Sequence, residues 1–311
     1  MANSINSTVS FFNFMTAAIA ELSSAGHFRT AETYTSTLRS LKCYTDNKDF
    51  LCSEIDHVLV AAYENFLTVK GMKRNSSSFY MRIFRAAYNK AVARGMARPI
   101  SPHPFSTVYT GVDKTAKRAL TIETISKIKN IDLSKSPSLI FARDMFLFSF
   151  YTRGMSLVDM AYLKKNDVKD GMISYTRRKT GKRLFIRMEK CMLEIIGKHS
   201  SPDSPYLLSI ISHPTSDQRK QYLSASHIIN RHLKEIGKKA DCGMILTMYV
   251  ARHSWANIAR HQHIPVSVIS EGMGHSSEST TKIYLDSINN SIIDHANHSI
   301  IESLYLDTAD Q

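Results

Sequence analysis

The sequence predicts a mainly α-helical protein with one small antiparallel β-sheet, divided into two domains. Apolar residues recur at helical spacing through most of the 311 residues, and only one short stretch has the pattern of a β-hairpin. Three prolines between Pro99 and Pro104 interrupt the helical pattern, because proline is excluded from helix interiors. We therefore expect a helical domain over residues 1–105, a linker at about 99–118 and a mixed domain over 113–311.

The first domain is expected to hold four helices. Apolar residues at i, i+3 and i+4 define them, near residues 8–25, 30–45, 53–70 and 76–96. Thr30 and Ser53 stand where N-caps are expected, and Ser53 with Asp56 fits a capping box in which Asp replaces Glu.

The second domain is expected to begin with a helix over 121–130, capped by Thr121, and to continue with a long apolar helix over 137–163. Two strands follow, at 172–175 and 184–188, joined by a turn that contains Gly181. Helical periodicity then resumes, and the expected helices cover 189–198, 224–239, 247–262, 265–273 and 288–305.

Basic residues are in excess, with 40 Lys and Arg against 27 Asp and Glu, which favours nucleic acid as partner over an anionic membrane surface. The segment from Asn65 to Val112 contains no acidic residue at all, and Tyr80 and Tyr88 interrupt its basic positions. A solvated helix surface is the alternative, but such surfaces usually mix charges of both signs. We expect these side chains to contact DNA phosphates: Lys70, Lys73, Arg74, Arg82, Arg85 and Lys90.

A second basic run lies on the predicted hairpin. Taken alone, it fits an edge strand protected by cations. Together with the motifs described next, it is interpreted as a second DNA-binding surface that includes Arg177, Arg178 and Lys182.

Targeting and metal-binding patterns are absent from the sequence. The apolar stretch at 11–20 has no preceding Lys or Arg, and the one at 139–151 is too short to span a bilayer. A basic amphipathic helix with a bulky apolar face, as in membrane-surface proteins, is also missing. The four cysteines are scattered without zinc spacing. We expect a cytoplasmic protein with reduced thiols.

The most informative segment runs from Tyr249 to Tyr284. It reads Tyr249-Val-Ala-Arg252-His-Ser-Trp, then Gly-Met-Gly-His275-Ser-Ser, then Thr-Thr-Lys-Ile-Tyr284. Arg252 has apolar neighbours in its predicted helix, so its permanent charge requires an anionic partner. Singly, these residues also fit a snorkelling arginine, a capping histidine and a core tyrosine. The ordered set is hard to obtain by chance.

This order resembles the tyrosine recombinase (phage integrase) family, in which an H-x-x-R-H-[ST] box precedes L-G-H and a nucleophilic tyrosine. The resemblance covers nearly the whole chain, because the family has a helical core-binding domain before its catalytic domain, and it is strongest toward integrases of Bacteroides-type mobile elements. It implies that Tyr284 is the nucleophile, Arg252 a phosphate-clamping arginine and His275 the third-box histidine. It also implies that Lys179 is the general acid for the leaving 5′ oxygen, with Lys182 as the alternative.

Two positions depart from the family pattern. Tyr249 replaces the H-x-x-R histidine; its phenol can bind a phosphate, but it is a poor acid–base group at neutral pH, and we keep it among the catalytic candidates. The pattern T-G-L-R-x-S-E places Ser156 at the first arginine. Arg153 lies three residues earlier, and on a helix it would share a face with Ser156 and reach the same phosphate. The alternative is a structural ion pair of Arg153 with Asp159 or Asp144.

The resemblance implies a site-specific DNA recombinase that cleaves and rejoins double-stranded DNA through a 3′-phosphotyrosyl intermediate, to integrate, excise or invert a mobile element. The covalent intermediate conserves the bond energy, so neither ATP, a metal nor another cofactor is expected. The implied partners are double-stranded DNA, other copies of the chain in a homotetrameric synapse, and a host DNA-bending protein, with a monomer free in solution.

Three questions stay open at the level of sequence. The helix expected at 288–305 would dock either on its own domain or on a neighbouring protomer. A DNA-binding regulator that has lost catalysis is one rival function, favoured by Tyr249 and Ser156. A type IB topoisomerase-like monomer is the other, and it would keep the same chemistry without synapsis.

Overall fold

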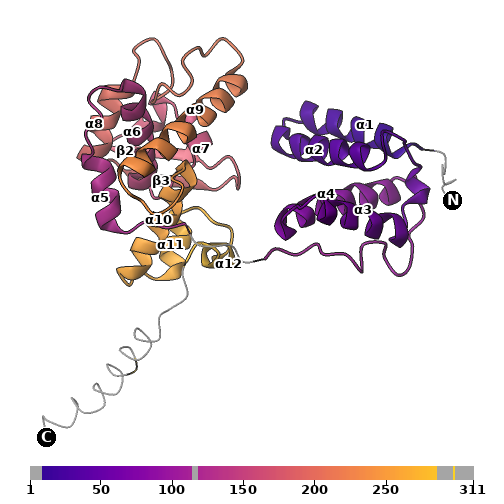
Figure 1. The fold of residues 1–311 in the computed structure, drawn as a ribbon. Coiled ribbons are helices and arrows are strands. Elements are labelled where there is room, and N and C mark those ends of the chain that lie inside the picture. The colour runs from indigo at the N-terminus through magenta and orange to yellow at the C-terminus, as the bar shows by residue number, and fades with distance from the viewer. Residues whose placement is uncertain (1–8, 114–117, 286–296, 298–311) are drawn as a thin grey trace, which may run out of the picture. The chain divides into compact units, whose positions relative to one another are not determined.

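A computed structural model describes residues 9–113, 118–285 and 297 (Figure 1). The chain divides into two units between Thr115 and Ala116, and each is described by itself. The first is helical, and the second combines helices with one small antiparallel sheet, so the predicted fold class is confirmed. Within the described residues, no helix is long and apolar enough to cross a membrane.

The first unit contains the four predicted helices and a short 3-10 turn. Its elements are α1 (Phe11–Ser24), α2 (Phe28–Tyr44), η1 (Cys52–Glu54), α3 (His57–Val69) and α4 (Arg74–Ala93). Helix α1 packs against α2 and α3 against α4, as Figure 1 shows. Their apolar stripes meet in a core whose largest fully buried side chains include Phe11, Tyr63, Phe84 and Tyr88.

Both predicted caps lie elsewhere, and one tyrosine of the acid-free segment lies in the core. Ser53 belongs to η1, and Asp56 caps α3 instead, because its side chain accepts a hydrogen bond from the Leu59 amide at 2.8 Å. Thr30 lies inside α2, which begins after His27. Tyr88 is a core residue whose hydroxyl donates to the Arg98 carbonyl, so it is not available to stack on DNA.

The second unit is built around a helix that is buried on nearly all sides. This helix is α6 (Pro137–Tyr151), which packs against α9 (Gln218–Lys239) and α10 (Met248–His261). The remaining helices are α5 (Ile122–Asn130), α7 (Leu157–Ala161), η2 (Lys165–Asp167), α8 (Lys190–His199), α11 (Val266–Gly272) and α12 (Glu278–Lys282). Thr121 caps α5 as predicted, accepting from the Thr124 amide at 3.3 Å. Helix α9 begins six residues before its predicted start.

The long helix predicted over 137–163 is wrong, because the chain turns after α6. Arg153 and Gly154 both have positive φ, 59° and 75°, which ends the helix. The chain then restarts at Ser156, whose side chain caps α7 by accepting from the Asp159 amide. This turn packs on α10, and it positions part of the site described below.

The sheet has three strands in the order β1-β2-β3, all antiparallel: β1 (Val168–Lys169), β2 (Met172–Thr176) and β3 (Arg183–Arg187). The two predicted strands are present, and the two-residue β1 adds an edge. Alternation along β2 buries Ile173 and Tyr175, and the next residue of this series, Arg177, is buried as well. The helix predicted at 288–305 lies outside the described residues.

Candidate active site

Helix α10 presents Arg252 to the turn after α6. The side chain is only 5% exposed, and its Nη1 donates to the Gly154 carbonyl at 2.7 Å while its Nη2 donates to the Met273 carbonyl at 2.7 Å. Gly154 is required here, because a Cβ atom at this position would lie 2.7 Å from the Arg252 Cα. Two backbone segments distant in sequence thus hold one guanidinium in place.

His275 follows α11 and reaches the same guanidinium. Its Nε2 lies 2.9 Å from Arg252 Nη2, and its Nδ1 lies 2.7 Å from Thr281 Oγ1. Burial, and after it the positive charges of Arg252, Arg177 and Lys179, together lower the pKa of His275 to about 4. The imidazole is therefore neutral at physiological pH in the free protein.

Tyr284 lies two residues after α12 and is 7% exposed. Its backbone carbonyl accepts from Asn257 Nδ2 at 2.7 Å, which ties the residue to α10. The phenol ring stacks on the His275 ring with centroids 5.2 Å apart, and the Arg252 guanidinium donates to the Tyr284 side chain. Arg252, His275 and Tyr284, predicted as catalytic residues, are thus brought together.

Tyr249 joins this cluster from the first turn of α10. It is 51% exposed, its ring lies 5.8 Å from that of Tyr284, and the two side chains are hydrogen-bonded. The His253 ring lies between them, 4.4 Å from Tyr249 and 4.5 Å from Tyr284. Partial burial and the bond to Tyr284 raise the pKa of Tyr249, so it keeps its proton at neutral pH.

The β2–β3 hairpin adds cations at the same place. Arg177 is 5% exposed, and its Nη1 donates to the Gly274 carbonyl at 2.8 Å. Lys179 is exposed in the turn, whereas Lys182 forms an ion pair with Glu271 at 2.7 Å. Of the two lysines, Lys179 is the one for which no ion pair is seen within the described residues.

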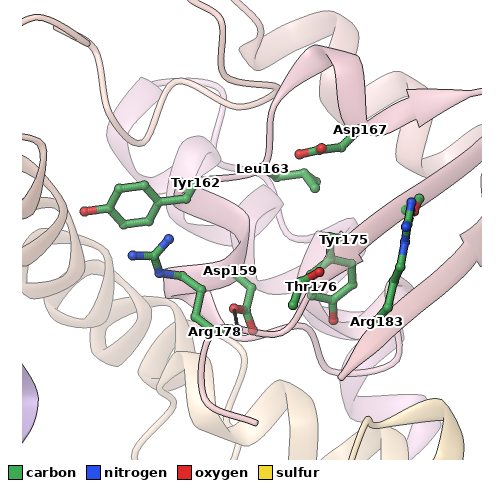
Figure 2. Close-up of a pocket in the computed structure, with 9 residues that line it drawn as sticks. Asp159, Tyr162, Leu163, Asp167, Tyr175, Thr176, Arg178 and Arg183 are labelled. Atoms are coloured by element: carbon green, nitrogen blue, oxygen red, sulfur yellow. Dashed lines mark hydrogen bonds between the residues drawn. The ribbon is translucent and has the colours of Figure 1, made fainter. Parts of the chain in front are cut away.

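Arg178, the neighbour of Arg177, points elsewhere. Its guanidinium lies over the Tyr162 ring at 4.2 Å, and its backbone amide donates to Asp159 Oδ1 at 2.9 Å. Figure 2 shows that Arg178 and Tyr162 line a pocket together with Tyr175 and Thr176. This pocket does not include Arg252, His275 or Tyr284.

Arg153 takes neither of the two arrangements considered for it. It is not helical, so the shared helix face with Ser156 does not exist. Its side chain lines a groove that also contains Trp255 and Gly272. Both candidate carboxylates are engaged elsewhere: Asp144 with Arg143 and His199, and Asp159 with Ser156 and the Arg178 amide.

The basic residues of the first unit are distributed along α4 and the end of α3. Arg74 stacks over the Tyr109 ring at 3.7 Å, and Arg85 donates to Thr110 at 3.0 Å. Lys90 forms an ion pair with Glu21 at 3.1 Å, so part of its charge is compensated. The other predicted DNA-contacting residues of this unit are exposed: Lys70, Lys73 and Arg82.

Comparison with known proteins separates the same two parts of the chain. The phage integrase SAM-like domain matches residues 10–107, and the phage integrase family matches residues 119–291, more than half of the chain. The chain belongs to the phage integrase family.

Among the curated relatives of this family member is tyrosine recombinase XerA of Pyrococcus furiosus, 29% identical over 178 residues. The match covers 56% of this chain and 58% of the length of that relative. A lambda integrase dimer bound to a COC′ core site has a similar fold, with a TM-score of 0.67 and 18% identity over 90% of this chain and 99% of that one. A lambda integrase tetramer bound to a Holliday junction gives a TM-score of 0.67 and 19% identity over 91% and 79%.

Proposed function

We propose that this integrase-family chain is a site-specific DNA recombinase that cleaves and rejoins DNA through a 3′-phosphotyrosyl intermediate. One observation carries the proposal: Arg252, His275 and Tyr284 come from three separate segments and converge at contact distance. A hydrophobic core gains nothing from a buried guanidinium. A phosphodiester under attack does gain from it, because the guanidinium stabilises its negative charge.

Tyr284 is the proposed nucleophile. Its phenolic oxygen forms a bond to phosphorus, the bond from phosphorus to the 5′ oxygen breaks, and the phenol proton passes to water. The leaving 5′ oxygen takes a proton from the Lys179 ammonium, which is exposed in the hairpin and, unlike Lys182, forms no ion pair with any of the described residues. Arg252 stabilises the negative charge that grows on the non-bridging oxygens, and His275 with the Met273 carbonyl orients its Nη2.

Tyr249 is proposed to hold Tyr284 in position. Its hydrogen bond to the Tyr284 side chain and its own raised pKa support a role as a retained proton donor. This role does not require the histidine that the family pattern places there. Tyr284 is then the nucleophile, and Tyr249 is the residue that positions it.

DNA binding is proposed to involve both units. The formal net charge of +13, the acid-free segment of the first unit and the basic hairpin of the second support contacts to phosphates on the duplex. Affinity should therefore fall steeply as salt concentration rises, with a slope set by the number of phosphates contacted.

The assembly is proposed to be a homotetramer on DNA. The similar structures of lambda integrase are a dimer bound to a core site and a tetramer bound to a Holliday junction, which supports this for a chain of the same fold. We also propose that the protein acts in the cytoplasm, that it serves a mobile element of the Bacteroides type, and that a host DNA-bending protein assists it.

The proposal is tested with nicked suicide duplexes that tile the DNA flanking the gene. A recombinase should give a protein–DNA complex that survives denaturation, with a free 5′ hydroxyl that polynucleotide kinase labels. Its 3′ end should stay blocked even after proteolysis, because a tyrosyl peptide remains attached to the 3′ phosphate. A duplex that is bound and shifted, but never covalently attached, would instead identify a DNA-binding regulator. Exchange between two duplexes carrying the mapped site distinguishes a recombinase from a topoisomerase-like monomer.

A further inference from the structure

We infer that Arg177 is a further catalytic residue, whose guanidinium contacts the scissile phosphate beside that of Arg252. It would supply the second arginine that Ser156 does not provide. The inference rests on the proposed function. It moves Arg177 from the predicted DNA-binding surface of the hairpin to the candidate active site.

The positions of the two guanidinium groups follow from their hydrogen bonds. Arg252 Nη2 donates to the Met273 carbonyl, and Arg177 Nη1 donates to the carbonyl of the next residue, Gly274. Consecutive residues are about 3.8 Å apart at Cα, so the two groups are anchored side by side on one short segment. His275 is the next residue of that segment, and the three cationic or polar groups surround one location.

Gly274 is adapted to this arrangement. It has a φ of 64°, and a Cβ atom there would lie 3.3 Å from Arg177 Cδ and 2.8 Å from Leu184 Cδ1. Thr180 of the hairpin turn also donates to the Gly274 carbonyl, at 3.2 Å. The hairpin that carries Lys179 is therefore fastened to the segment that carries His275.

Burial of both arginines without an anion is the observation that indicates a ligand. Arg177 and Arg252 are each 5% exposed, and within the ranges that the structure describes neither forms an ion pair with a carboxylate. Their charges have the same sign, and the pKa of Arg252 is lowered by burial and then by Arg177. Buried charges are costly unless they are paired. Two adjacent guanidinium groups match the negative charge that is spread over the oxygens of a phosphate in the transition state of cleavage.

The other arginines nearby are less suited to this role. Arg178 is exposed and stacks on Tyr162, and both residues line the pocket shown in Figure 2. Arg153 lines the groove beside Trp255. Strand alternation explains the difference within the hairpin, since Ile173, Tyr175 and Arg177 point inward and Arg178 does not.

The test compares Arg177→Ala with Arg231→Ala, a control at an exposed arginine of α9. Each variant is given the duplex on which the wild-type protein forms its covalent complex, with either an ordinary phosphodiester or a methylphosphonate at the scissile position. The methylphosphonate replaces one charged oxygen by a methyl group, so an arginine that neutralises this oxygen is no longer needed. Single-turnover cleavage and duplex affinity are measured separately.

Arg177→Ala should cleave the phosphodiester about 100- to 1,000-fold more slowly, bind the duplex as the wild type does, and recover most of its rate on the methylphosphonate. Arg231→Ala should cleave the phosphodiester at a rate close to that of the wild type. The inference is overturned if Arg177→Ala cleaves normally, if it is equally slow on both linkages, or if its only defect is weaker binding.

A second measurement needs no DNA. In phosphate-free buffer, Arg177→Met should raise the thermal midpoint by removing a buried like-charge contact, and inorganic phosphate should stabilise the wild type more than this variant. A lower midpoint with an unchanged phosphate effect would show a merely structural arginine and overturn the inference. If the wild type forms no covalent complex on any duplex but the phosphate effect is lost in Arg177→Met, the recombinase proposal fails while the anion site stands.

Discussion

Arg252 Nη2 and His275 Nε2 lie 2.9 Å apart, and this contact determines the tautomer of the imidazole. A guanidinium has no acceptor, so Nε2 must accept and the ring proton must reside on Nδ1. Nδ1 then donates to Thr281 Oγ1 at 2.7 Å. A chain of three side chains from three segments fixes the orientation of the guanidinium that the proposed mechanism uses.

The Thr281 hydroxyl should be needed for this chain. Thr281→Val keeps the shape of the side chain but leaves a buried N–H of His275 without its acceptor, which should cost about 1–3 kcal/mol of unfolding free energy. Chemical denaturation measures the change. Thr280→Val, at the neighbouring and more exposed position, is the control and should change stability little; equal losses in both variants would contradict the assigned tautomer.

His275 should make the free protein less stable in mild acid. Its pKa is about 4 in the folded protein and near 6.5 when unfolded, so between these values the unfolded state binds more protons. Stability contributed by this group is therefore complete above pH 6.5 and is lost as the pH falls toward 4. NMR titration should place the His275 transition well below 6.5, and His275→Asn should reduce the loss of stability between pH 7 and 5. A His275 transition at 6.5 would contradict this electrostatic environment.

Gly154 should be intolerant of even one added methyl group. Gly154→Ala combines a φ of 75° with a Cβ placed 2.7 Å from Arg252 Cα, so it should displace that arginine and slow covalent complex formation about 100-fold. Gly171→Ala is the matched control, with a φ of 70° and no atom within 4 Å, and should cost only the backbone strain of about 1–2 kcal/mol. Normal cleavage by Gly154→Ala would show that this contact does not position Arg252.

Glu21 should weaken DNA binding by the first unit. It forms ion pairs with Lys90 and Arg94, and hydrogen bonds from Arg94 and then Lys90 lower its pKa to about 2, so it is ionised at neutral pH. Glu21→Gln should free these cations, tighten duplex binding, and steepen the dependence of log affinity on log salt by about one. Glu32→Gln makes the same change in net charge next to Arg29, outside the acid-free segment. An identical effect of the two variants would indicate only a general charge effect.

Much of the fold followed from periodicity, and the exceptions have physical causes. The four helices of the first unit each carry a continuous apolar stripe, and such stripes are local properties of the sequence. The break after α6 is different, because the apolar residues that resume at Leu157 continue the helical pattern past the turn at Arg153 and Gly154. There the chain turns to meet Arg252, almost a hundred residues away, and no local pattern contains that contact.

The candidate site shows the same division. Motif spacing identified Arg252, His275 and Tyr284, which the structure brings together. The roles of Thr281 and Gly154 depend on contacts between segments, and the sequence carried no sign of them beyond the residues themselves. Arg177 could have been found, because the alternation of Ile173 and Tyr175 predicts that it points inward. Because the side chain is charged, Arg177 was instead predicted to lie on an exposed DNA-binding surface.

Tyr284, and not its neighbour Tyr249, is expected to be the nucleophile. Wild-type protein, Tyr284→Phe and Tyr249→Phe should be incubated with the nicked flanking duplexes and examined on denaturing gels for covalent protein–DNA complexes. We predict that the complex disappears in Tyr284→Phe and persists, at a reduced rate, in Tyr249→Phe. A complex that persists in Tyr284→Phe and is lost in Tyr249→Phe would contradict this prediction and assign the nucleophile to the exposed tyrosine of α10.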